Sequence, residues 1–375
     1  MPRLVALDLD LDDRFARALE GVLARGDAIC VLDRRLSPTL KRAQLERYQP
    51  AVVLDADGEH EVGPGQQVQD GDALFMATSG SSGEPKVAIH TLAGLEASVW
   101  ATTGALGMDP SRHRWLACLP PSHIGGLAVI LRSVLCSIPL SVARPGDLDT
   151  GLDAALAAGA THTALVPTQL ERCDPSRFEA ILLGGAAPLH ALPANVISTY
   201  GMTETASGVV YGGRALPGVQ LGTDDDGELY LKGPMLLRCF DDGHDPRVTG
   251  PDGTPGWLPT GDLGAISPDG HLEVHGRRTE VINTGGEKVH PVRVEAALRR
   301  HPGVKAVAVW KRPDPTWGER VVAYVVPADP SDPPNLAALK AVAEVLEPWA
   351  FPKELVLLEE LPMTASGKVA RRLLD

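Results

Sequence analysis

The amino-acid sequence predicts an α/β protein with a large N-terminal domain of mixed sheets covered by helices and a small α+β C-terminal domain. The chain has 375 residues, which is more than one ordinary hydrophobic core holds. In its first half, short apolar runs alternate with helix-like segments, a pattern typical of a largely parallel sheet with helices on both faces. After about residue 201 this alternation ends and hairpin signals begin. Together these observations predict two domains.

The first half is expected to begin with two strands around a helix. Strands over 28–32 and 51–54 flank a helix that Ser37 caps, with Pro38 at its first position. The further strands predicted from short apolar runs are 73–78, 115–119, 140–143, 163–166 and 180–183. The helices predicted between them are 92–106, 124–136 and 148–158.

The second half is expected to be richer in hairpins. Asp-Gly pairs at 226–227, 252–253 and 269–270 lie near β-rich sequence and predict an antiparallel subdomain over about 213–276. From residue 279 the pattern predicts a helix at 292–300, strands at 305–310 and 320–326, another helix and a last strand at 354–358. We therefore expect domains of residues 1–277 and 278–375.

Composition and charge narrow the class of protein. Hydrophobic residues make up 44% of the chain and charged residues 22%, which indicates a folded globular protein. The net charge of −13 disfavours attraction to a phosphate backbone, so no nucleic-acid partner is expected. Residues 279–375 contain 13 basic and 13 acidic residues, so the whole negative excess lies before them. This shift supports a boundary near residue 278.

The sequence predicts a cytoplasmic protein with no membrane partner. Its five cysteines are scattered, with no C-x-x-C pair, which is typical of buried thiols in a reduced compartment. The N-terminus turns acidic at once and lacks the apolar segment of a signal peptide. The most apolar stretch, 115–143, is interrupted by three prolines, a histidine and an arginine, unlike a membrane span. A homodimer is left open.

A loop rich in glycine and serine directly follows the strand predicted at 73–78. Small residues of this kind let backbone N–H groups close around an anion, and a lysine at its end adds positive charge. The pattern is not a Walker A motif, because Glu84 and Pro85 separate the last glycine from the lysine. A phosphate loop and an ordinary surface loop both remain open. The candidate phosphate-binding residues are Thr78, Ser79, Gly80, Ser81, Ser82, Gly83 and Lys86.

Five motifs occur in one order along the chain. They are TSGSSGEPK (78–86), YGMTET (200–205), TGD (260–262), GRRTEVINTGGEKVHPVRVE (276–295) and PMTASGKVARR (362–372). This set resembles the adenylate-forming superfamily of acyl-CoA synthetases, luciferases and adenylation domains, from about residue 72 to the end. The resemblance implies a large N-terminal domain joined by a hinge to a small mobile C-terminal domain.

The resemblance implies binding of ATP and Mg²⁺ and assigns residue roles. The 78–86 loop would hold the β- and γ-phosphates, and Thr203 and Glu204 would hold phosphate and Mg²⁺, for which a carboxylate is a suitable ligand. Lys368 would bridge the α-phosphate and the attacking carboxylate and stabilise developing charge. The residues implied around the adenine and ribose are Gly184, Gly185, Ala186, Tyr200, Gly201, Asp262 and Arg277.

The resemblance also implies a CoA thioester as product. The family's hinge falls at Thr279, where many relatives have Asp. Gly285 and Gly286 lie where the family passes pantetheine toward the adenylate, and glycines suit the wall of a narrow tunnel.

Three residues are candidates for binding the acid. His123, between a strand and a helix, is either a pocket residue or a core or capping histidine, and Arg132 interrupts an apolar helix, where it either reaches solvent or meets a carboxylate. The stretch 163–170, which contains Thr168, and the HxxGL…R arrangement resemble the 2-succinylbenzoate:CoA ligases of menaquinone synthesis. The alternatives are another aryl or short-chain acid:CoA ligase, a stand-alone enzyme loading a carrier protein, and a silent nucleotide-binding regulator.

Overall fold

The computed structural model divides the chain into two compact units, and the first contains two separate sheets. It describes residues 1–78, 86–144, 148–185, 192–363 and 369–374. The first unit comprises residues 1–221 and 231–258, and the second comprises residues 222–230 and 259–375. The boundary predicted between residues 277 and 278 stays a prediction.

The first sheet has a parallel centre and antiparallel edges. Its order is β16-β6-β5-β2-β1-β3-β4. The central strands β5, β2, β1 and β3 run parallel to one another. Its strands are β1 (Leu4–Leu7), β2 (Ala28–Val31), β3 (Val52–Asp55), β4 (Gly58–Glu61), β5 (Asp72–Ala77), β6 (Val87–Thr91) and β16 (Cys239–Phe240). Strands β1, β4 and β6 were not predicted from the sequence, although all four residues of β1 are buried.

The second sheet is parallel over five of its seven strands. Its order is β13-β12-β11-β10-β9-β7-β8, and only β12 and β13 run antiparallel to their neighbours. Its strands are β7 (Trp115–Ala117), β8 (Leu140–Val142), β9 (His162–Leu165), β10 (Ala180–Leu183), β11 (Val196–Met202), β12 (Ser207–Tyr211) and β13 (Arg214–Ala215). The parallel strands predicted from the sequence are therefore divided between two mixed sheets, in agreement with the predicted fold class.

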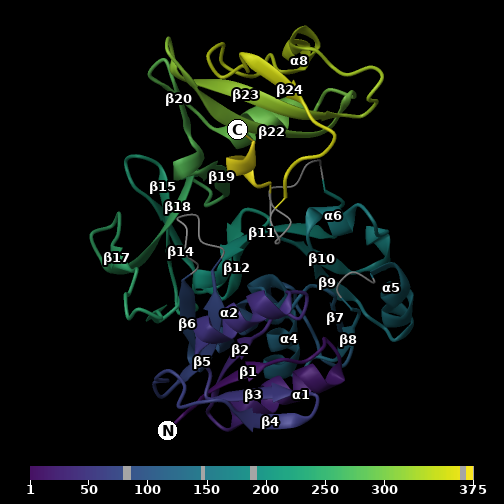
Figure 1. Cartoon of the computed structure of the whole chain (residues 1–375), viewed down its shortest axis with the longest axis vertical. Helices are drawn as coiled ribbons and strands as arrows, with labels where there is room; N and C mark the ends of the chain where they lie inside the picture. The colour runs from purple at the N-terminus through teal and green to yellow at the C-terminus, as the bar shows by residue number, and fades with distance from the viewer. Residues whose placement is uncertain (79–85, 145–147, 186–191, 364–368, 375) are drawn as a thin grey trace. The chain divides into compact units, whose positions relative to one another are not determined.

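Helices pack between and around these sheets (Figure 1). The helices of this unit are α1 (Asp13–Ala24), α2 (Pro38–Tyr48), α3 (Leu92–Ala105), α4 (Ile124–Cys136), α5 (Leu148–Ala157) and α6 (Pro167–Leu170). One core cluster contains residues of α1, α3 and α4 together with residues of both sheets. This position explains why α4 is apolar nearly all round. The Ser37 cap predicted for α2 is confirmed, since its hydroxyl accepts from the Leu40 N–H at 3.4 Å.

The third sheet is antiparallel and includes the predicted Asp-Gly hairpins. Its order is β14-β15-β18-β17, with β19 pairing β18. Its strands are β14 (Gln220–Thr223), β15 (Glu228–Lys232), β17 (Val248–Thr249), β18 (Pro255–Ile266) and β19 (Leu272–Arg277). Two strands of the expected subdomain, β13 and β16, pair instead with β12 and β6.

The C-terminal part is an α+β fold with its own core. The sheet order is β21-β20-β23-β22, and β24 pairs parallel with β23. Its elements are β20 (Ile282–Thr284), β21 (Glu287–Val289), α7 (Pro291–Leu298), β22 (Val304–Asp314), β23 (Gly318–Pro327), α8 (Leu336–Val342) and β24 (Glu354–Leu357). The predicted fold class is confirmed, and only the short β20–β21 hairpin was missed here.

Two further features concern the whole described chain. All five cysteines are free thiols. Among the described residues, no helix has the length and apolar character needed to cross a membrane.

Candidate active site

Predicted site residues follow four parallel strands of the second sheet. Because β7, β9, β10 and β11 are parallel neighbours, their carboxyl ends meet at one edge. Ligands of open α/β sheets bind at this edge. The residues there are His123 after β7, Thr168 after β9, Gly184 and Gly185 after β10, and residues 200–204 from the end of β11 onward. The sheet thus gathers several predicted adenine, phosphate and acid residues.

Gly184 and Gly185 form the turn predicted after β10. The Gly184 N–H donates to the Leu165 carbonyl at 3.0 Å. The φ of Gly185 is +90°, in the region that favours glycine, and a Cβ there would lie 3.3 Å from Val166. The chain can therefore pass close to β9 at this point. Ala186 lies outside the described residues.

Gly201 is required by the close approach of β11 and β12. A Cβ at this position would lie 2.1 Å from the carbonyl oxygen of Ser207. The pairing of the two strands shifts register between Tyr200 and Gly201. Tyr200, the predicted adenine-stacking residue, is half-buried beside this irregularity.

The Thr203–Glu204 backbone is held by residues far away in the sequence. It forms the short 3-10 helix η2 (Thr203–Thr205). The Nε2–H of His90 donates to the Thr203 carbonyl at 2.8 Å, and the Leu237 N–H donates to the Glu204 carbonyl at 2.8 Å. These contacts fix the turn that carries the predicted phosphate and Mg²⁺ ligands.

His90 is a neutral, buried histidine on β6. Burial lowers its pKa to about 4, so the ring is uncharged at neutral pH. Its Nε2 makes the contact to Thr203, while its Nδ1 has no hydrogen-bond partner among the described residues. The ring therefore acts as a single N–H donor to the η2 turn.

The two ends of the glycine and serine loop are described, and its centre is not. The loop joins β5 to the antiparallel β6, and the Thr78 N–H donates to the Lys86 carbonyl at 2.7 Å. The Lys86 ammonium lies 4.9 Å from the centroid of the Phe240 ring. Ser79, Gly80, Ser81, Ser82 and Gly83 lie outside the described residues, so their phosphate role stays a prediction.

Arg132 is a buried cation on α4, only 3% exposed. It does not reach solvent, and no carboxylate in the described part of the chain pairs with it. Its Nη2 donates to the Ser207 hydroxyl at 3.1 Å and to the Tyr211 hydroxyl at 3.3 Å. The guanidinium lies 5.5 Å from the Trp115 ring centroid, and its Nε has no described partner.

The hydroxyl groups beside Arg132 have second partners on α3. Ser98 lies 3.1 Å from the Ser207 hydroxyl, and Thr102 lies 3.0 Å from the Tyr211 hydroxyl. Ser98 and Thr102 are four residues apart and so share one helix face. Neutral hydroxyls do not balance a buried positive charge. The site is therefore chemically suited to an anion.

His123 and Thr168 differ in how firmly they are held. His123 occupies the N-cap position of α4, but its side chain makes no capping hydrogen bond. Its Nε2 instead lies 3.1 Å from Nη2 of Arg35. Burial and the nearby Arg35 charge lower the pKa of His123 below its usual value. Thr168 is exposed at the start of α6.

The predicted ribose-binding pair of the second unit is an ion pair. Asp262 and Arg277 are opposite each other on β18 and β19. The Arg277 Nε lies 2.9 Å from the Asp262 carboxylate, and its Nη1 donates to the Thr260 carbonyl at 2.9 Å. Asp262 is only 6% exposed. These contacts fix the orientation of the carboxylate.

The remaining predicted residues also belong to this unit. Gly285 and Gly286 form the turn between β20 and β21, with φ values of +61° and +90°. A Cβ on Gly285 would lie 2.7 Å from the Trp317 ring. Thr279 is exposed in the short 3-10 helix η3 (Arg278–Glu280). Lys368 lies outside the described residues.

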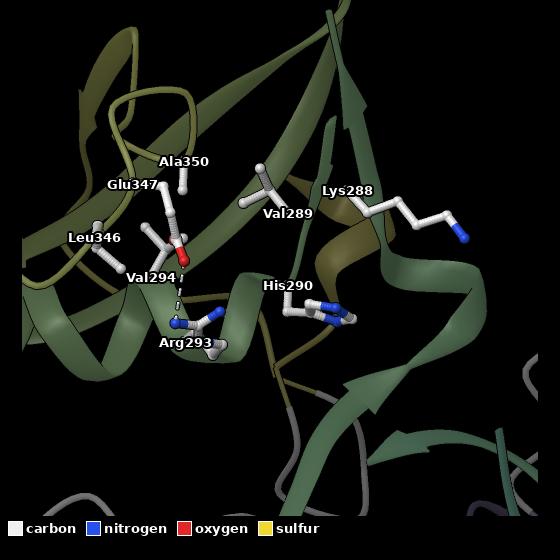
Figure 2. Close-up of a pocket in the computed structure, with 8 residues that line it drawn as sticks. All are labelled: Lys288, Val289, His290, Arg293, Val294, Leu346, Glu347 and Ala350. Carbon is white, nitrogen blue, oxygen red and sulfur yellow. Dashed lines mark hydrogen bonds and ion pairs between the residues drawn. The ribbon is translucent and has the colours of Figure 1, made fainter. Parts of the chain in front are cut away.

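A small pocket in the second unit is separate from these residues (Figure 2). Its walls come from β21, α7 and the segment before β24, and Arg293 points toward Glu347 at 3.5 Å. It has room for at most a single water molecule. It is lined by Lys288, Val289, His290, Arg293, Val294, Leu346, Glu347 and Ala350.

Comparison with known proteins places the chain in a family. Residues 14–240 match the AMP-binding enzymes, and residues 293–368 match the C-terminal domain of AMP-binding enzymes. The chain belongs to the family of AMP-binding enzymes. It is 40% identical to a probable 2-succinylbenzoate–CoA ligase of Mycobacterium tuberculosis, over 90% of this chain and 93% of that protein.

Solved structures of two other proteins share the fold of this AMP-binding enzyme. The o-succinylbenzoate CoA synthetase of Bacillus subtilis is 26% identical to this chain. Its complex with the acyl-adenylate intermediate has a TM-score of 0.82, covering 99% of this chain and 88% of that one. Its complex with ATP and a magnesium ion has a TM-score of 0.83, covering 99% of this chain and 89% of that one. The amide bond synthetase of Marinactinospora thermotolerans is 25% identical, with a TM-score of 0.81 over 100% of this chain and 90% of that one.

Several residues around the site of this AMP-binding enzyme were not predicted from the sequence. They contact predicted residues over long separations in the chain: His90 contacts Thr203, and Arg35 contacts His123. Ser207 and Tyr211 contact Arg132. No local pattern marks such partners, although the arginine within an apolar helix did point to Arg132 itself.

Proposed function

We propose that this AMP-binding enzyme is an acid:CoA ligase that converts 2-succinylbenzoate to its CoA thioester in menaquinone biosynthesis. The structural observation that carries the choice of acid is Arg132, a buried guanidinium with hydroxyl partners and no described carboxylate partner. The similarity to the Mycobacterium tuberculosis ligase supports the same substrate. A cytoplasmic location is part of this proposal, and the free cysteines favour it.

ATP binding in this proposal uses the residues that the sequence motifs assign to it. Tyr200 stacks on the adenine, Gly184 and Gly185 let the backbone approach the base, and Asp262 accepts from the ribose hydroxyls while Arg277 orients it. Thr78 and Lys86 belong to the loop that holds the terminal phosphates.

The Thr203–Glu204 turn is suited to hold phosphate and Mg²⁺. Hydrogen bonds from His90 and Leu237 fix its backbone, so the turn that carries the Glu204 side chain is held in place. One or two carboxylates together with phosphate oxygens are the usual ligands of Mg²⁺. When bound, the ion neutralises charge on the phosphates.

The acid is held at both of its carboxylates. Arg132 binds the carboxylate that does not react, because a charge-assisted contact there balances the buried guanidinium. The other carboxylate attacks the α-phosphorus of ATP, and pyrophosphate leaves. Lys368 stabilises the charge that develops in this step. His123 and Thr168 lie at the same sheet edge and complete the acid site.

Thioester formation follows as a second step. The CoA sulfur attacks the acyl carbonyl, and AMP leaves with the bonding electrons. Thr279 is the residue at which the C-terminal part reorients between the two steps. The turn of Gly285 and Gly286 admits the narrow pantetheine chain.

The proposal is tested by CoA-dependent AMP release from ATP and Mg²⁺ with 2-succinylbenzoate, benzoate, salicylate and octanoate. We expect turnover of 2-succinylbenzoate alone. The matched substrate controls are 2-butanoylbenzoate and 4-oxo-4-phenylbutanoate, each of which keeps the ring and the ketone but lacks one of the two carboxylates. Turnover of either control at the rate of 2-succinylbenzoate would contradict the role given to Arg132, and turnover of another acid alone would contradict the choice of substrate.

The acceptor of the acyl group in the second step is tested separately. The structural similarity to an amide bond synthetase shows that this fold occurs with acceptors other than CoA. Release of pyrophosphate with 2-succinylbenzoate but no thioester with CoA would favour a carrier protein or an amine as acceptor.

A further inference from the structure

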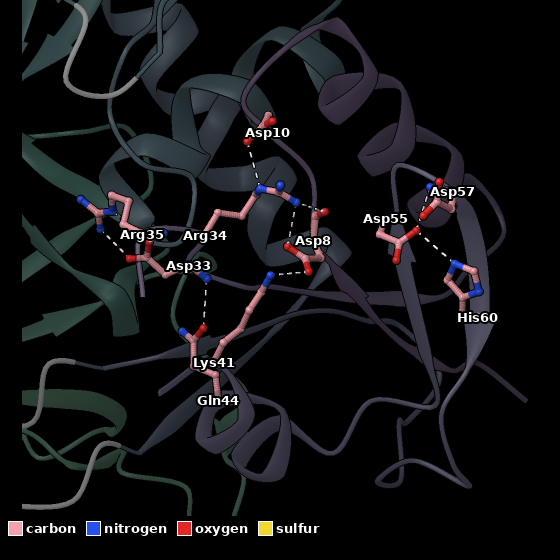
Figure 3. Close-up of polar contacts among 10 residues, drawn as sticks. All are labelled: Asp8, Asp10, Asp33, Arg34, Arg35, Lys41, Gln44, Asp55, Asp57 and His60. Atoms are coloured by element: carbon pink, nitrogen blue, oxygen red, sulfur yellow. Dashed lines mark hydrogen bonds and ion pairs between the residues drawn. The ribbon is translucent and has the colours of Figure 1, made fainter. Parts of the chain in front are cut away.

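An aspartate and arginine pair connects the end of β2 to His123. The Arg35 Nε donates to Asp33 Oδ1 at 2.8 Å, and Nη2 donates to Oδ2 at 2.5 Å. The same Nη2 lies 3.1 Å from His123 Nε2. Figure 3 shows Arg35 turned toward Asp33 in this arrangement. His123 is thus reached by a cation that is 88 residues away in the sequence.

Asp33 is itself held on several sides. Its backbone N–H donates to the Gln44 side chain at 3.0 Å, and the Ser122 hydroxyl donates to its Oδ2 at 3.0 Å. The residue is 8% exposed. Its hydrogen bonds from Arg35 and Ser122 outweigh the effect of burial and lower its pKa to about 2, so it stays ionised. The carboxylate therefore joins Arg35 to the residue next to His123.

The chemistry of the guanidinium decides where the His123 proton lies. Every nitrogen of a charged guanidinium is a donor and none is an acceptor. At 3.1 Å from Arg35, the His123 Nε2 must therefore be the acceptor. A neutral imidazole that accepts at Nε2 carries its proton on Nδ1.

We propose that Arg35, oriented by Asp33, is a positioning residue that holds His123 as the neutral Nδ1–H form. His123 then offers its Nδ1–H as a donor to an acceptor oxygen of the acid substrate. The substrate part of this inference rests on the proposed function, whereas the proton position does not. It also gives the N-terminal sheet a part in acid recognition.

Arg34 supplies a matched control. It is the neighbour of Arg35 in the sequence and forms ion pairs with Asp8 at 3.1 Å and with Asp10 at 2.9 Å (Figure 3). Both arginines have partly exposed side chains. Only Arg35 contacts His123. A change at Arg34 therefore tests for general effects of losing a surface arginine.

The first measurement is ¹⁵N NMR of the histidine rings in the full-length protein, with His123 assigned from a His123→Gln variant. We expect a proton on Nδ1 in the wild type and in Arg34→Met. In Arg35→Met we expect the Nε2–H form to appear and the pKa of His123 to rise, since Arg35 and Asp33 are the described charges that face it. A wild-type proton on Nε2, or an unchanged ring in Arg35→Met, would overturn the inference.

The second measurement is steady-state kinetics. We expect Arg35→Met to raise KM for the acid about tenfold, with little change in KM for ATP or CoA, because one hydrogen bond is misaligned. Arg35→Lys keeps the charge but loses the two-point contact with Asp33, so its effect should be intermediate. Arg34→Met should match the wild type. Equal increases in all three KM values would show a merely structural role and contradict the proposal.

The two measurements separate the two claims. If the wild type turns over none of the acids, the proposed function fails, and the NMR experiment still decides the position of the proton. Thermal unfolding of each variant shows whether a loss of activity reflects a loss of folded protein.

Discussion

Single residues around the site are held by contacts that link distant parts of the chain. His90 donates to the Thr203 carbonyl, and Arg35 reaches His123. Both histidines are kept neutral by burial, and each uses one ring nitrogen for a defined partner. The turn with Glu204 and the start of α4 are thereby fixed before a substrate binds.

The buried His90 should make stability depend on pH. Its folded pKa of about 4 lies below the ordinary value of 6.5, so the unfolded chain takes up a proton first as the pH falls. The contribution of His90 to the free energy of unfolding is fully present above pH 6.5. It should decline by about 1.4 kcal/mol per pH unit as the pH falls toward 4. Urea unfolding of wild type and His90→Gln between pH 4.5 and 7.5 checks this, and we expect a shallower dependence in the variant. Equal slopes in the two proteins would contradict it.

At the scale of elements, α4 combines good packing with one unbalanced charge. The helix is buried between two sheets, and its core-facing residues include Leu127, Ile130 and Leu131. Arg132 breaks this apolar surface, and its partners among the described residues are two hydroxyls and an aromatic ring. A buried charge without a counter-charge lowers the stability of the free protein and favours the binding of an anion.

Arg132→Met should therefore make the protein more stable and less active. Ser207 and Tyr211 keep partners in Ser98 and Thr102, so the variant leaves no hydroxyl unpaired. We expect the free energy of unfolding to rise by about 1–3 kcal/mol. We expect kcat/KM for 2-succinylbenzoate to fall about 100-fold, since a charge-assisted contact is lost. A variant that is both less stable and fully active would contradict this account.

Elements with local signals were predicted well, and nonlocal pairing was not. The cap and proline of α2 lie next to the helix that they start, so the sequence alone predicted its first turn. The strand β1 is only four residues long and is followed by acidic residues, which hid it. The division of the parallel strands into two sheets depends on helices that pack between them. The hydrophobic periodicity of the sequence does not indicate such packing.

The same distinction applies to the candidate site. Short motifs predicted Gly185, Gly201 and the Thr203–Glu204 turn, and the structure supplies a steric or hydrogen-bond reason for each. The partners of Arg132 and His123 come from other elements, so only the folded chain reveals them.

At the scale of the whole molecule, the proposed reaction needs different residues in its two steps. In this proposal Lys368 acts only while pyrophosphate leaves, so Lys368→Ala should slow acyl-adenylate formation by about 10²- to 10³-fold. The variant should still convert a preformed acyl-adenylate with CoA at nearly the wild-type rate. Single-turnover assays of each step measure this, and an equal loss in both would remove the assignment.

Thr279→Pro should have the opposite effect. Proline fixes φ and removes a backbone donor, so it restricts rotation at the proposed hinge. Acyl-adenylate formation, measured by pyrophosphate release, should stay near the wild-type rate. Thioester formation should fall by about 100-fold, because a misplaced acceptor costs about that much. Thr279→Ala is the control, since it changes the side chain but keeps the backbone free, and it should match the wild type. Unchanged thioester formation in Thr279→Pro would show that rotation at this residue is not needed.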